Sequence, residues 1–98
     1  QLIFVNGSAP ASGKIHNWVL VKPRTIDSVA ALGMEAGVDP AAVTYSPAIL
    51  ASTHSAIPGR RSETFFIAPD SPGQYPFIST VGDEWIKMRG VLIVRPLG

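Results

Sequence analysis

Glycine and proline divide this chain into short apolar runs, and that spacing is the strongest constraint on its fold. The 98 residues include 9 glycines and 9 prolines, most of which stand between apolar stretches. Each run has the length of a strand and ends at a turn signal. Together the runs predict an antiparallel β-sandwich. They cover residues 2–5, 15–21, 48–53, 62–68, 75–80 and 90–94.

One stretch has helical rather than strand periodicity. Ile26, Val29 and Ala30 recur at the spacing of one helix face, and glycine stands near the end of the pattern. We therefore expect an all-β fold with one helical insert at about residues 26–38. The sequence contains no repeat and no low-complexity tract, so residues 1–98 are expected to form a single domain.

Composition excludes several classes of protein. The chain has 8 Lys and Arg against 7 Asp and Glu, a formal net charge of +1, and nucleic-acid binding requires a clearer cationic excess. A hydrophobic content of 46% excludes disorder, and no apolar run reaches the roughly 20 residues of a membrane helix. Zero cysteines exclude disulfides and thiolate chemistry. The charged fraction of 15% is low, which favours a surface that is covered by a partner.

The start of the chain suggests that more sequence precedes it. Gln1 is not a methionine, and the residues that follow it already form an apolar strand pattern. We therefore expect an upstream segment, either a further strand, a signal peptide or a membrane anchor.

Two segments far apart in the chain contain an ordered set of motifs. The first is HNWVL at residues 16–20. The second starts with PGQY at 72–75, continues along a strand to Ser79, and ends with MRG at 88–90. In this order the motifs resemble the cupredoxin (blue copper) family, most closely its azurin and auracyanin branch, over nearly the whole chain. The resemblance implies a Greek-key antiparallel β-sandwich with the helical insert of that branch.

The chain departs from this family at two of the four copper-ligand positions. By resemblance, His16 and Met88 keep the first histidine and the axial methionine, whereas Ser79 replaces the cysteine and Glu84 replaces the second histidine. A blue copper site is a His₂Cys arrangement with a weak axial Met, and a serine hydroxyl cannot supply the thiolate. We therefore expect no copper and no other cofactor. The alternative is an altered His16, Glu84 and Met88 site for Cu(II) or Zn(II), in which Met is a poor zinc ligand.

Several of these residues are predicted to have structural roles. The resemblance implies that Asn17 braces the ligand loop by side-chain hydrogen bonds. Tyr75 follows a Pro-Gly turn, which predicts a tyrosine corner, and His16 is expected to be a neutral, hydrogen-bonded core histidine. Ser79, His16 and Glu84 could be combined into a hydrolase triad, but no nucleophile elbow or oxyanion motif accompanies them. We therefore expect that the protein is not an enzyme.

Trp85 and Ile86 are the candidate partner-binding residues. They lie in the loop that, in the resembled family, covers the metal and forms an apolar docking face. Exposed Trp and Ile reduce solubility unless a partner covers them, and Trp is enriched at interfaces. The alternative is that the pair packs inward and fills the empty site.

The function expected from these features is that of a copper-free accessory subunit. By resemblance, such a protein docks on the periplasmic face of a bacterial membrane electron-transport complex, either respiratory or a photosynthetic reaction centre. Its partners are then protein subunits, and it reaches the membrane through them or through the upstream segment. The alternative function is a periplasmic metal-binding protein that uses the altered His, Glu and Met site.

Overall fold

The computed structural model describes residues 1–8, 10–36, 47–81 and 84–96 of the chain. Its strands form two sheets in which every pairing is antiparallel. The smaller sheet pairs β1 (Leu2–Val5) with β4 (Arg61–Thr64). The larger sheet has the order β3-β2-β5-β6. Its strands are β3 (Ile49–Ser52), β2 (Val19–Val21), β5 (Gly73–Ile78) and β6 (Arg89–Val94).

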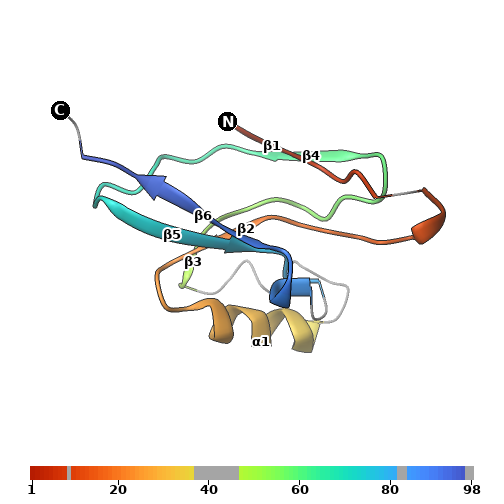
Figure 1. Cartoon of the computed structure of the whole chain (residues 1–98), viewed down its shortest axis with the longest axis horizontal. Coiled ribbons are helices and arrows are strands. Elements are labelled where there is room, and N and C mark those ends of the chain that lie inside the picture. Colours follow the sequence, from red (N-terminus) through yellow and green to blue (C-terminus); the bar gives the residue numbers. More distant parts are fainter. Residues whose placement is uncertain (9, 37–46, 82–83, 97–98) are drawn as a thin grey trace.

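The elements are stacked in three layers (Figure 1). The β1–β4 ribbon lies on one side of the four-stranded sheet, and α1 (Ile26–Ala36) lies on the other. Two short 3₁₀ helices, η1 (Pro10–Ser12) and η3 (Glu84–Ile86), occupy the connections that lead into β2 and β6. The prediction of an all-β fold with one helical insert is therefore confirmed.

Side chains alternate between two directions along residues 18–21, so this segment contributes to both hydrophobic clusters of the protein. Trp18 and Leu20 point to the cluster between the two sheets, and Val19 and Val21 point to the cluster beneath α1. The inter-sheet cluster also contains Tyr75 of β5, against which Leu2, Phe4, Phe66, Phe77, Leu92 and Val94 pack. The helix-side cluster is completed by Val29, Ala30 and Ile78. Both faces of β2 are thus buried, in agreement with its unbroken apolar sequence.

Two of the observed strands are shorter than the sequence predicts. The predicted strand 15–21 is regular only from Val19, because Asn17 and Trp18 donate their backbone N–H groups to side-chain hydroxyls instead of to a neighbouring strand. The predicted strand 62–68 ends at Thr64, which pairs with Leu2 at the start of β1. The helix begins at Ile26 as predicted, while the predicted end at residues 37 and 38 lies outside the described residues.

Tyr75 fastens the turn that precedes its own strand. Its hydroxyl donates a hydrogen bond of 2.6 Å to the backbone oxygen of Ser71, four residues upstream. The ring is buried in the inter-sheet cluster. This is the geometry of a tyrosine corner.

Phe77 and Gly90 form the tightest pairing between β5 and β6. They are opposite each other in the antiparallel register, and a Cβ atom added at Gly90 would lie 2.4 Å from the Phe77 ring. The centroid of the Phe77 ring in turn lies 5.6 Å from that of Trp18.

We predict that Gly90→Ala lowers the free energy of unfolding by about 1–3 kcal/mol, because overpacking displaces the Phe77 ring. Urea denaturation of the purified domain measures this loss. Gly7→Ala is the matched control, since no atom lies within 4 Å of a Cβ there, and it should change stability by less than about 0.5 kcal/mol. Equal stability of the two variants would contradict the proposed close approach.

Candidate functional site

The four residues predicted to stand at copper-ligand positions lie at one end of the larger sheet. His16 lies before β2, Ser79 directly follows β5, Glu84 begins η3, and Met88 directly precedes β6. Backbone bonds hold this end together, because the Ser79 N–H donates to the Met88 oxygen at 3.0 Å and the Met88 N–H donates to the Glu84 oxygen at 2.7 Å. The fold therefore retains the convergence of these positions.

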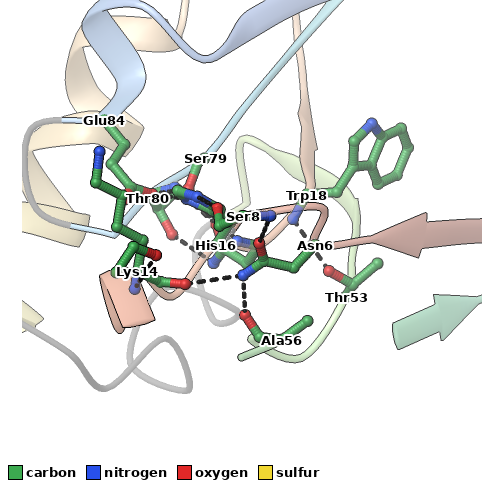
Figure 2. A network of polar contacts seen from close by, with 12 residues as sticks. Asn6, Ser8, Lys14, His16, Trp18, Thr53, Ala56, Ser79, Thr80 and Glu84 are labelled. Atoms are coloured by element: carbon green, nitrogen blue, oxygen red, sulfur yellow. Dashed lines mark hydrogen bonds and ion pairs between the residues drawn. The ribbon is translucent and has the colours of Figure 1, made fainter. Parts of the chain in front are cut away.

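A single carboxylate oxygen joins three of these positions (Figure 2). Glu84 Oε1 lies 2.8 Å from His16 Nδ1 and accepts a hydrogen bond of 2.7 Å from the Ser79 hydroxyl. The other ring nitrogen of His16, Nε2, lies 3.0 Å from the Ser8 hydroxyl. When the imidazole is neutral, its Nδ1–H group donates to Glu84 and its Nε2 atom accepts from the Ser8 hydroxyl. Both nitrogens of the buried His16 ring therefore have hydrogen-bond partners within the protein.

Asn17 ties the approach to β2 to the end of β5. Its side-chain oxygen accepts from the Thr80 N–H at 2.7 Å and from the Ser79 hydroxyl at 3.3 Å, and its side-chain nitrogen donates to the Thr80 hydroxyl at 2.8 Å. Asn17, Ser79 and Thr80 are all buried. These bonds fix the segment that carries Ser79 against the segment that carries His16.

Trp85 and Ile86, which the sequence grouped as one docking pair, have different environments. Trp85 packs against the helix-side cluster, and the Arg89 guanidinium lies 5.6 Å from its ring centroid. Ile86 is 57% exposed. Trp85 therefore packs inward, against the helix-side cluster, and Ile86 is the more exposed residue of the pair.

A hollow of about 430 Å³ opens at this end of the protein. Its lining combines three of the ligand positions with an apolar residue and two cations. These residues are Lys14, His16, Glu84, Ile86, Lys87 and Met88. The sequence did not predict the contributions of Lys14, Lys87 and Ser8. Lys14 and Lys87 lie within two residues of a predicted ligand position, whereas Ser8 lies in a loop with no distinguishing pattern.

The donor chemistry of this site does not fit a blue copper centre. The hydroxyl of Ser79 and the Nδ1 atom of His16 are both bonded to Glu84 Oε1 rather than directed at a shared free point. A hydroxyl lacks the covalency of a thiolate, and carboxylate oxygens favour harder ions than Cu(I). Across the described ranges there is no cluster of three or more His, Cys, Asp or Glu that could hold a metal ion.

Comparison with solved structures decides the family. Auracyanin B is 34% identical, with a TM-score of 0.76, and the match covers 97% of this chain and 69% of that one. The dithionite-reduced auracyanin of the photosynthetic bacterium Roseiflexus castenholzii is 30% identical over 96% of this chain and 74% of its own, with a TM-score of 0.81. The chain belongs to the cupredoxin family.

A third cupredoxin supports the assignment to the azurin and auracyanin branch. The azurin Az-iso2 of Methylomonas sp. strain J is 30% identical over 93% of this chain and 73% of that one, with a TM-score of 0.77. No protein-family model and no curated protein matches the sequence. This cupredoxin therefore keeps the β-sandwich and helical insert of its relatives while Ser and Glu stand at two of the expected ligand positions.

We predict that Glu84→Ala lowers the free energy of unfolding by about 1–2 kcal/mol, because the Ser79 hydroxyl and His16 Nδ1 lose their shared acceptor. Denaturant titration followed by tryptophan fluorescence measures the change. Glu63→Ala is the control, since that carboxylate is exposed and accepts only from Gln1 on the surface. A loss no larger than in Glu63→Ala would show that the carboxylate contact contributes nothing to the fold.

Proposed function

We propose that this cupredoxin is a copper-free accessory subunit, not an enzyme, that docks on the periplasmic face of a membrane electron-transport complex. The observation that carries the proposal is the position of Glu84 Oε1, which bonds both His16 and Ser79. A carboxylate in that position satisfies the polar groups that a metal would otherwise bind. The protein then keeps the family scaffold without its redox ion.

The outward surface at the same end supports a docking role. Ile86 is largely exposed, and it borders the hollow together with the partly buried Met88. In the proposed assembly, a partner that enters the hollow would cover both apolar side chains. The low charged fraction of the chain, 15%, agrees with a surface that is covered in the working assembly.

The choice of a membrane electron-transport complex is based on family analogy. Cupredoxins of the azurin and auracyanin branch serve electron transport outside the cytoplasmic membrane, and one relative comes from a photosynthetic bacterium. The proposed partners are therefore protein subunits of a respiratory or photosynthetic reaction-centre complex. In the part of the chain that the structure describes, no helix is long and apolar enough to cross a membrane.

Metal analysis tests the copper-free part of the proposal. After incubation with Cu(II) or Zn(II) and desalting, we expect far less than one metal ion per chain, because His16 and Ser79 are bonded to Glu84. Ser79→Cys/Glu84→His is the positive control, since it restores the His₂Cys donor set beside Met88 and should retain copper with an intense visible absorption. About one metal ion per unmodified chain would instead favour the alternative metal-binding function.

Exchange of Ile86 tests the docking part of the proposal. We expect Ile86→Ser to reduce co-purification with membrane electron-transport complexes by roughly tenfold, the effect of a modest interface anchor. The measurement is quantitative mass spectrometry of the solubilised complexes. Ile93→Ser is the matched control, because Ile93 is 56% exposed on β6 and does not line the hollow. Co-purification that is unchanged in Ile86→Ser, or reduced equally in both variants, would contradict docking through this end.

A further inference from the structure

The hollow beside His16 has an excess of positive charge. Lys14 and Lys87 both line it and both are exposed, and neither forms an ion pair with any described residue. Glu84 is the single carboxylate among the described lining residues, and its Oε1 atom already bonds His16 and Ser79. Among the described residues that line the hollow, the two lysines therefore outnumber the single acid whether His16 is neutral or protonated.

The rest of the lining is apolar. Ile86 and Met88 border the same space as the two lysines. An inorganic anion bound by the lysines would leave both apolar side chains in water, whereas a polypeptide segment can pair charge and bury apolar surface at once. The combination of charges and apolar surface thus favours a protein segment over a free ion.

We propose that the hollow receives an acidic segment of the partner subunit, in which an Asp or Glu carboxylate lies between Lys14 and Lys87 and a neighbouring apolar side chain covers Ile86 and Met88. This inference rests on the proposed docking function and specifies the chemistry of the partner. Residues from the approach to β2 and from the η3–β6 connection form one recognition surface. The lysines select the acidic partner, and the apolar residues contribute the buried area.

The first test uses the isolated protein and a matched pair of synthetic peptides, acetyl-Leu-Glu-Leu-amide and acetyl-Leu-Gln-Leu-amide. NMR titration should show shifts confined to the residues around the hollow with the Glu peptide and much smaller shifts with the Gln peptide. Lys14→Gln and Lys87→Gln should each weaken binding about twofold to fivefold, as for exposed ion pairs. Equal binding of both peptides would overturn the inference. Sodium acetate that binds as well as the Glu peptide would identify a free-anion site instead.

The second test uses the assembled complex and separates this inference from the proposed function. Lys14→Gln/Lys87→Gln should reduce co-purification and flatten its dependence on salt concentration. Lys22→Gln/Arg95→Gln removes the same charge from exposed residues outside the hollow and should change neither. If Ile86→Ser reduces co-purification but the double lysine variant does not, the docking proposal holds and the inference of an acidic partner segment is wrong. If co-purification needs neither, both proposals fail.

Discussion

The hydrogen bonds to Glu84 Oε1 organise the end of the molecule that holds the candidate site. The carboxylate connects the end of β5 and the start of η3, which are close in sequence, with His16 before β2, which is 68 residues from Glu84. Buried donors are costly when unpaired, so this acceptor allows the polar groups of His16 and Ser79 to remain buried. Asn17 adds bonds to Ser79 and Thr80 that hold the same segments in place. Protein hydrogen bonds thus connect the segments that carry three of the predicted ligand positions.

The layered core explains why the adjacent residues Trp85 and Ile86 have different environments. The two sheets and α1 bury their apolar faces along the length of the molecule, and Trp85 belongs to the helix-side cluster. Because η3 is a single tight turn, Ile86, which directly follows Trp85, faces outward. Lys14, from the connection before β2, and Lys87, from the connection before β6, line the hollow at the same end. One short segment therefore contributes both to the interior and to the exposed surface.

The sequence was informative about the fold because the signals are local or belong to ordered motifs. Glycine and proline spacing located all six described strands, and apolar periodicity placed the start of α1 at Ile26. The strand ends were less predictable, because they depend on partners. The strand after Arg60 pairs with β1 only as far as Thr64, opposite Leu2, and the backbone of Asn17 and Trp18 bonds to hydroxyls that lie elsewhere in the chain.

For the candidate site, the sequence by itself determined which chemistry is missing, since the absence of cysteine is a fact of composition that no folding can change. Tertiary structure decided what replaces it. The contact between His16 and Glu84 spans 68 residues, and Ser8 joins the network from a loop with no distinguishing pattern. Whether Trp85 or Ile86 faces outward also depends on three-dimensional packing, because both are apolar and adjacent. Burial and long-range hydrogen bonding are properties of the assembled layers, and no spacing along one chain specifies them.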